Sequence, residues 1–377
     1  MESDSHGSAA VETPEAPPAS DRNGEPLLHA EGVWKLFGSK ADKIIGTPDA
    51  DLSRSEMREK TGVVCAVRDV SIDVWPGEVF VVMGLSGSGK STLVRTLIRL
   101  IEPTAGTVRI GDQDVTGADA SALRELRRHR VSMVFQHFGL LAHRTVMDNV
   151  AFGLEIQGVS KAERLKRANE MLELVGLHDV ANSFPAQLSG GMQQRVGLAR
   201  AFAVDPELML YDEPFSALDP LIRRDMQDEV IRLQEETGKT MIFITHDLPE
   251  ALRLGDRIAI MRDGAIVQLG SPEELVGSPA DEYVENFIRD IPRTHVLTLR
   301  WIMRDPQPGE TSEGPELPVT TTMQNAVPLV ASTDQPVRAV QDGKVVGIVD
   351  REAILRAMAE DPDTSTAATR GGADGGS

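Results

Sequence analysis

A nine-residue stretch, residues 84–92, constrains the fold more than any other part of the chain; its sequence is Gly-Leu-Ser-Gly-Ser-Gly-Lys-Ser-Thr. It satisfies the phosphate-loop pattern of Gly, four residues and then Gly-Lys-Ser. The apolar run 79–83 before it predicts a buried strand, and the apolar residues after it, at 3.6-residue spacing, predict a helix. We therefore expect an α/β domain in which a strand, a glycine-rich loop and a helix follow one another.

The residue types of this loop suit a triphosphate. Its glycines let consecutive backbone N–H groups turn toward phosphate, at a helix N-terminus whose dipole favours negative charge. Lys90 is expected to reach the β- and γ-phosphates, and the Ser91 hydroxyl to ligate Mg²⁺. The residues of the loop that are predicted to bind nucleotide are Gly84, Ser86, Gly87, Ser88, Gly89, Lys90, Ser91 and Thr92.

Two carboxylates end a second predicted strand, which begins at residue 208. Asp212 is expected to hold the metal through water, and Glu213 to polarise the water that attacks the phosphate. A strand that simply ends in solvated acids is the alternative, and the presence of Lys90 argues against it.

Composition and charge exclude several classes of protein. The chain has 377 residues, enough for one domain of about 250 residues and a smaller appendage. Its apolar runs are far shorter than the roughly 20 residues that cross a bilayer, and we expect no secretory signal. The single cysteine suits a reducing cytoplasm. The net charge of −19 disfavours nucleic acid and anionic lipid as partners, so membrane association would require a protein partner; solubility is the plainer explanation of the charge.

Residues 188–195, Leu-Ser-Gly-Gly-Met-Gln-Gln-Arg, open another predicted helix. This stretch resembles the signature sequence of the ATP-binding-cassette (ABC) family, and the resemblance extends over residues 27–290 with all motifs in family order. It implies an ATPase with Mg²⁺ as cofactor, and a head-to-tail homodimer with two ATP molecules between phosphate loop and signature. The residues that it implies for contact in trans are Ser189, Gly190, Gly191, Gln193 and Asp219.

The same resemblance assigns three further positions. Gln136 resembles the glutamine that touches Mg²⁺ and reports the nucleotide state to a membrane partner. His246, in the sequence Thr-His-Asp, resembles the switch histidine that contacts the γ-phosphate and is predicted to be catalytic together with Glu213. Phe37 stands where the family stacks an aromatic ring on adenine, with Trp34 as a competitor.

The predicted fold class is α/β: an ABC-type phosphate-loop ATPase core with an antiparallel subdomain and a helical subdomain, plus a small C-terminal α+β appendage. We predict a disordered acidic tail at 1–24 and the ATPase domain at 25–290, with the helical subdomain at about 137–190. A polar insertion at 39–62 holds a short helix candidate around 53–60. The appendage spans 291–360, and residues 361–377 form a second disordered tail.

Among ABC proteins the chain is most similar to the ATP-binding subunits of quaternary-amine importers for glycine betaine and proline. This implies permease subunits in the membrane, indirect work with a periplasmic or extracellular substrate-binding protein, and a place on the cytoplasmic face of the plasma membrane. The alternatives are an importer ATPase for another small solute, such as an amino acid or polyamine, and a soluble ABC ATPase outside transport.

Residues 321–358 are expected to form a helix, a strand at 336–340, a turn, a strand at 345–349 and a final helix. That order resembles the end of a cystathionine-β-synthase (CBS) type module, but the length allows one repeat at most. Regulation by ionic strength or nucleotides and a plain dimer-stabilising role both stay open.

Overall fold

The structure, a computed structural model, describes residues 24–135, 139–216, 218–307, 314–333 and 335–359. Apart from Gly24, the two predicted tails lie outside these residues, and so does Gln136. Within the described part of the chain, no helix combines the length and the apolar character that a membrane span requires.

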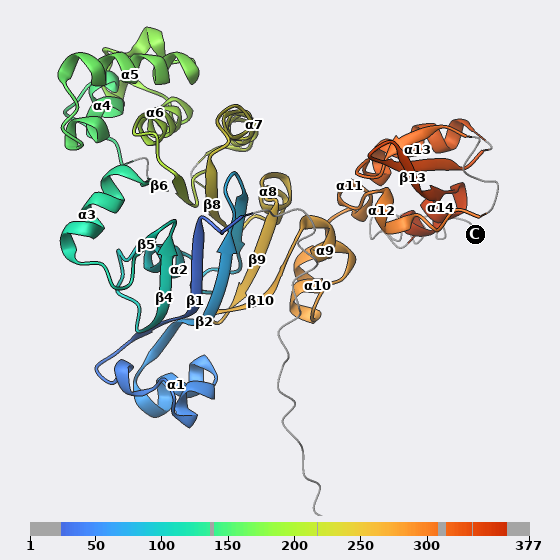
Figure 1. The fold of residues 1–377 in the computed structure, drawn as a ribbon, viewed down its shortest axis with the longest axis horizontal. Helices are drawn as coiled ribbons and strands as arrows, with labels where there is room; N and C mark the ends of the chain where they lie inside the picture. The colour runs from blue at the N-terminus through green and yellow to red at the C-terminus, as the bar shows by residue number, and fades with distance from the viewer. Residues whose placement is uncertain (1–23, 136–138, 217, 308–313, 334, 360–377) are drawn as a thin grey trace, which may run out of the picture.

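A six-stranded sheet forms the centre of the larger domain (Figure 1). In spatial order its strands are β10 (Ala265–Gly270), β9 (Arg257–Arg262), β3 (Val79–Met83), β8 (Thr240–Thr245), β7 (Leu208–Asp212) and β6 (Val131–Phe135). All neighbours are parallel except β10 and β9, which form an antiparallel hairpin. Every residue of β3, β7 and β8 is buried, as expected for parallel strands covered on both faces.

Alternate side chains of the central strands enter two separate hydrophobic cores. On β3, Phe80 and Val82 enter one core, whereas Val81 and Met83 enter the other. The first core is closed by α2 (Lys90–Leu97), α3 (Ala120–His129) and a four-stranded antiparallel sheet. The strands of that sheet, in spatial order, are β2 (Val64–Val74), β1 (Leu28–Phe37), β4 (Ala105–Ile110) and β5 (Gln113–Asp114).

The second core lies against the helices of the opposite face. Those helices are α4 (Val146–Ile156), α5 (Lys161–Leu174), α6 (Gly190–Ala203), α7 (Pro220–Thr237), α8 (Leu248–Leu254), α9 (Pro272–Gly277) and α10 (Glu282–Ile288). The short 3₁₀ turns η3 (His178–Val180) and η4 (Pro185–Gln187) lie between α5 and α6. Figure 1 shows α4, α5 and α6 gathered at one end of the domain. The predicted α/β core with an antiparallel part and a helical part is confirmed.

The insertion between β1 and β2 is ordered. It contains the 3₁₀ turns η1 (Ala41–Lys43) and η2 (Pro48–Asp51) and the helix α1 (Arg54–Thr61). Ser53 and Glu56 form a capping box at the start of α1, and Gly62 ends the helix in the left-handed conformation. The helix expected around 53–60 is therefore present.

A separate three-stranded sheet forms beyond α10 (Figure 1). We call α11 (Arg293–Val296), α12 (Leu299–Ile302), β11 (Glu316–Pro318), α13 (Met323–Ser332), β12 (Val337–Gln341), β13 (Lys344–Val349) and α14 (Arg351–Ala359) the C-terminal module. The predicted helix, two strands and final helix are present; β11, only three residues long, was not predicted. The Trp301 ring lies against Gly277 of α9, and its Nε1 donates to Glu273 Oε2 at 2.9 Å.

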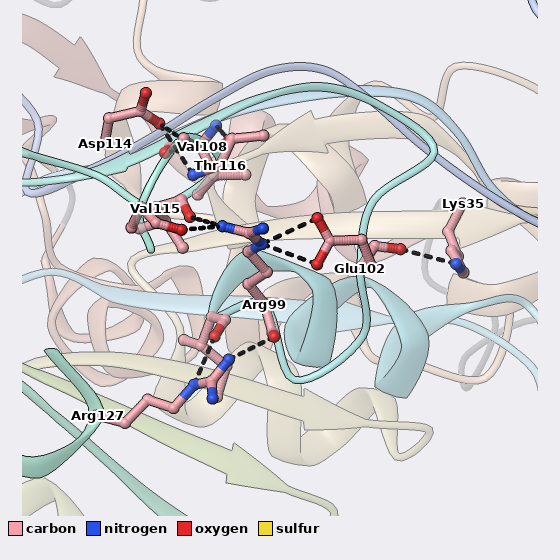
Figure 2. Close-up of polar contacts among 11 residues, drawn as sticks. Lys35, Arg99, Glu102, Val108, Asp114, Val115, Thr116 and Arg127 are labelled. Atoms are coloured by element: carbon pink, nitrogen blue, oxygen red, sulfur yellow. Dashed lines mark hydrogen bonds and ion pairs between the residues drawn. The ribbon is translucent and has the colours of Figure 1, made fainter. Parts of the chain in front are cut away.

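A network of arginines fixes the end of the helix that follows the phosphate loop (Figure 2). Arg99 Nε donates to both carboxylate oxygens of Glu102, and its Nη1 donates to the backbone oxygen of Val115. Arg127 of α3 donates to the backbone oxygen of Arg99, and Lys35 of β1 donates to that of Glu102 at 2.7 Å. The segment that follows α2 is thus joined to both β1 and α3.

Candidate nucleotide site

The phosphate loop, residues 84–92, begins where β3 ends and leads into α2. Gly84 and Gly89 have φ of 150° and 111°, values that side chains rarely adopt. A Cβ on Gly89 would lie 2.1 Å from the backbone oxygen of Ala66, and one on Gly84 would lie 2.4 Å from that of Met261. Only glycine fits these two positions, because the backbone of the loop passes directly against neighbouring strands.

Two side chains of the loop are buried. Lys90 Nζ donates to the backbone oxygens of Gly84 at 2.8 Å and Leu85 at 3.2 Å. Burial lowers the pKa of Lys90, and the nearby carboxylates of Glu213 and Asp212 oppose that shift. Ser88 is also buried, and its Oγ has no hydrogen-bond partner within the described chain. Ser86 is exposed at the rim of the loop.

Ser91 and Asp212, predicted to hold the metal from distant parts of the sequence, are in direct contact. Ser91 Oγ donates to Asp212 Oδ1 at 2.9 Å. The other oxygen, Oδ2, accepts from Arg95 Nη2 at 3.0 Å. Thr92 follows Ser91 in the first turn of α2 and is partly buried.

These residues fit a magnesium ion. A hydroxyl and a carboxylate are hard oxygen donors, and Mg²⁺ takes few protein ligands because it keeps several waters and binds substrate phosphates. Among the described residues, no cluster of three or more His, Cys, Asp or Glu side chains is suited to a metal. Gln136, the third predicted ligand, lies outside those residues.

The two predicted catalytic residues meet at the ends of neighbouring strands. Glu213 directly follows β7 and His246 directly follows β8. His246 Nδ1 lies 3.2 Å from Glu213 Oε2, with the histidine side chain 56% exposed and the glutamate 23%. Glu213 has a φ of 48°, and its backbone N–H donates to Ile244 O at 3.1 Å. The parallel pairing of β7 and β8 therefore holds an acid and an imidazole together.

A small cavity of about 20 Å³ lies behind this pair. Its lining includes Arg223 of α7 and Glu250 of α8. Burial, and then the charge of Asp247, raise the pKa of Glu250 to about 8. Within the described residues, Glu250 Oε1 and Arg223 Nε have no hydrogen-bond partner.

The residues predicted to act in trans lie at two helix N-termini. Ser189 caps α6, where its Oγ accepts from Met192 N at 3.4 Å, and Gly190 and Gly191 form the first turn. Asp219 caps α7 and accepts from Ile222 N at 3.0 Å. The two N-termini are adjacent, because a Cβ on Gly191 would lie 2.7 Å from the Ile222 side chain.

Gln193 supports the loop before α6. Its Nε2 donates to the backbone oxygens of Pro185 and Leu188 at 3.1 and 3.2 Å. These bonds hold the segment that leads into Ser189, so Gln193 stabilises the start of α6 within its own chain.

Phe37 ends β1 opposite Val64, and its ring is exposed. Lys35 Nζ lies 4.9 Å from the ring centroid. Trp34, the competing aromatic residue, packs against the hydrophobic cluster of the insertion. The exposure of Phe37 favours it as the ring that meets a base.

Three polar residues near these groups were not predicted from the sequence: Arg54, Arg95 and Glu250. Arg95 contacts Asp212 from a distant part of the sequence, and Glu250 lines the small cavity with Glu213 and His246. One local signal was available for Glu250, since it stands three residues after Asp247 as in a capping box, and Asp247 accepts from its backbone N–H at 3.1 Å.

A phosphate cradle on a parallel sheet, with an acid and a histidine at the next strand ends, defines a nucleoside triphosphatase of the phosphate-loop class. The family model described as "ABC transporter" matches residues 67–216. The glycine betaine transport ATP-binding protein OpuAA of Bacillus subtilis is 49% identical over 308 residues, covering 82% of this chain and 74% of that protein. The chain belongs to the ABC transporter ATP-binding proteins and is an ATPase.

Two other comparisons agree with this assignment. The trimethylamine N-oxide transport system ATP-binding protein TmoW of Ruegeria pomeroyi is 47% identical, covering 88% of this chain and 97% of that protein. The cassette MJ0796, solved as a dimer bound to ADP and Pi, is similar with a TM-score of 0.54 and 33% identity, over 65% of this chain and 99% of that one.

Proposed function

We propose that this ATPase works as a head-to-tail homodimer, binds two ATP molecules with Mg²⁺, and drives import of a small methylated amine through a membrane permease. Two contacts beside the phosphate loop carry the catalytic part: Ser91 of α2 meets Asp212 at the end of β7, and Glu213 meets His246 directly after β7 and β8.

In each copy, Lys90 and the loop N–H groups bind the β- and γ-phosphates. Ser91, Asp212 and Gln136 would hold Mg²⁺, which would neutralise charge on these phosphates. Glu213 polarises a water whose oxygen attacks the γ-phosphorus, and it takes a proton from that water as the bond to the β–γ bridging oxygen breaks. His246 holds the γ-phosphate, and ADP and phosphate are released.

The second copy is proposed to complete each site. Ser189, Gly190 and Gly191 of one copy would present free N–H groups of α6 to the γ-phosphate bound by the other, because a helix N-terminus favours an anion. Gln193 would keep α6 in position, and Asp219 would connect the two sites. Support comes from the capped start of α6 and from the dimeric state of the solved relative MJ0796.

The transport role rests on the relatives. We propose that two copies dock under permease subunits on the cytoplasmic face of the plasma membrane, and that a substrate-binding protein delivers the cargo from outside. The segment after Gln136 would transmit the nucleotide state to the permease. A soluble ATPase without a permease is the alternative, and co-purification with an integral-membrane protein separates the two.

Glycine betaine is the first candidate cargo, because relatives named for its transport are 49% and 53% identical to this chain. Trimethylamine N-oxide is the second. One observation favours it: the match extends over 97% of the TmoW protein of R. pomeroyi but over only 74% of OpuAA.

Uptake measurements test the proposal. Cells without amine uptake of their own would express this chain with its permease and binding protein, and uptake of labelled glycine betaine, trimethylamine N-oxide, choline and proline would be measured with and without hyperosmotic shock. We expect uptake of a methylated amine with the wild-type chain and none with Lys90→Ala. Uptake of none of these, with ATPase activity intact, would refute the cargo.

We further propose that the C-terminal module is a single CBS-like repeat. Support comes from its element order, β11, α13, β12, β13 and α14, and from its own hydrophobic core. Two such repeats would meet only across the homodimer. Whether the module regulates turnover or stabilises the dimer is decided by the ionic-strength dependence of ATPase activity in chains with and without residues 293–377.

A further inference from the structure

The inserted segment, residues 39–62, begins next to Phe37, a residue of the proposed nucleotide site. It leaves β1 directly after Phe37 and returns at the start of β2 (Figure 1). Its two ends are close together, because a Cβ on Gly38 would lie 3.3 Å from the backbone oxygen of Gly62. The segment therefore begins and ends next to Phe37, the residue whose ring is proposed to stack on the base.

The segment has its own structural support. Met57 of α1 is fully buried in a cluster with side chains of β1 and β2. Arg68 of β2 donates to the backbone oxygens of Ala50 at 3.0 Å and Leu52 at 2.5 Å, and Lys60 pairs with Asp49 at 2.6 Å. These contacts hold α1 in one position against the ATPase domain.

One side chain of the segment reaches the phosphate loop. Arg54, the first residue of α1, donates from Nη1 to the backbone oxygen of Gly87 at 2.5 Å. Gly87 lies in the middle of the loop with a φ of 81°, and no heavy atom lies within 4 Å of the place of its missing Cβ. The middle of the loop thus receives a charged hydrogen bond from a segment outside the central sheet.

The segment carries no net charge that would attract a nucleotide by itself. Residues 39–62 contain five basic and five acidic side chains, so the segment as a whole is not an electropositive patch. Arg54 is half-buried at the loop, whereas Arg58, one turn later on α1, is exposed. A hydrogen bond from a guanidinium is stronger than one from a neutral donor, so it restrains the Gly87 peptide within the loop whose N–H groups are proposed to face phosphate.

We propose that the inserted segment is a functional wall of the nucleotide site and that Arg54 is a positioning residue, which holds the phosphate loop through Gly87 in the form that binds the polyphosphate of a nucleotide. This inference rests on the nucleotide site proposed above.

Equilibrium binding of MgADP and MgATP to the full chain, with the KM and kcat of ATP hydrolysis, tests the inference. Arg54→Ala should weaken binding and raise KM by about tenfold, the effect of losing one charged hydrogen bond, with kcat at saturating ATP nearly unchanged. Arg54→Lys should recover most of the affinity, because an ammonium group can also donate to the Gly87 oxygen.

Arg58→Ala is the matched control, since it removes the same charge from the same helix away from the loop. Equal effects of Arg54→Ala and Arg58→Ala, or no effect of either, would overturn the inference. Lys90→Ala separates this outcome from a failure of the proposed nucleotide site. If Lys90→Ala binds MgADP like wild type, the proposed site is wrong. If Lys90→Ala loses binding but Arg54→Ala binds like wild type, the site stands and the role of the inserted segment is wrong. Thermal melts of all variants show that each is folded.

Discussion

Glu250 is a buried carboxyl next to the reacting groups, yet no proposed step uses it. Its pKa of about 8 keeps it mainly neutral at pH 7, so it adds little negative charge beside Glu213 and Asp247. The adjoining cavity of about 20 Å³ has room for one water, which could serve Glu250 Oε1 and Arg223 Nε. A neutral carboxyl at this position does not repel a phosphate bound nearby.

The stability of the protein should fall as pH rises through the titration of Glu250. The unfolded carboxyl loses its proton near pH 4.5 and the folded one near pH 8, so the stabilising contribution of Glu250 is complete below 4.5 and is lost between these values. The free energy of unfolding of Glu250→Gln, relative to wild type, should therefore be higher at pH 8 than at pH 5, by on the order of 1–3 kcal/mol. Urea unfolding at both pH values measures this gain, and an equal difference at both would contradict the raised pKa.

At the scale of elements, the parallel pairing of β3, β8 and β7 explains how the site assembles. The carboxyl ends of parallel strands lie at one edge of a sheet, so the phosphate loop, His246 and Glu213 converge although they are far apart in sequence. The close approach of β2 to the loop at Ala66 adds a steric requirement, which Gly89 meets at the N-terminus of α2.

Gly89→Ala should destabilise the protein by more than the strain of a positive φ alone, because the added Cβ would also clash with the backbone of Ala66. Gly46→Ala is a matched control, because Gly46 also has a positive φ of 79° but no atom lies near its missing Cβ. We expect the control to cost about 1 kcal/mol, and Gly89→Ala about 2–4 kcal/mol together with loss of nucleotide binding. Denaturant unfolding and MgADP binding provide the comparison; equal costs would show that Ala66 yields easily.

The elements and the contiguous motifs were predictable because their signals are local. The phosphate loop follows from glycine spacing, and β3, β7 and β8 follow from uninterrupted apolar runs. The pairing of Arg95 with Asp212 was not predictable, because it joins residues 117 apart in the sequence. The contact of Arg54 with Gly87 depends on the path of the insertion, which the small cluster around Met57 determines.

At the scale of the whole molecule, ATP binding and ATP hydrolysis should have separate effects on the proposed dimer. The N-termini of α6 and α7, proposed to act in trans, are adjacent to each other within one chain. ATP would then form part of the interface between two copies, and hydrolysis would weaken that interface. A chain that binds ATP without hydrolysing it should remain dimeric.

Glu213→Gln tests this separation. We expect normal ATP binding, turnover reduced by about 10²–10³-fold, and an ATP-bound dimer in size-exclusion chromatography with light scattering. Glu235→Gln, at an exposed position of α7, should behave like wild type. The double variant Glu213→Gln with Ser189→Arg should stay monomeric in MgATP. Wild-type turnover of Glu213→Gln would exclude its role as base, and a dimer of the double variant would exclude the sandwich.

The arginine network at the end of α2 has a consequence for what the site selects. Lys35 bonds to the backbone oxygen of Glu102 and also lies over the Phe37 ring, so one side chain connects the proposed base-stacking ring with the segment that follows α2. Every base offers an aromatic face to a ring, and no hydrogen bond to a base edge is proposed. We therefore expect the site to bind nucleotides mainly through their phosphates, with little discrimination between adenine and guanine.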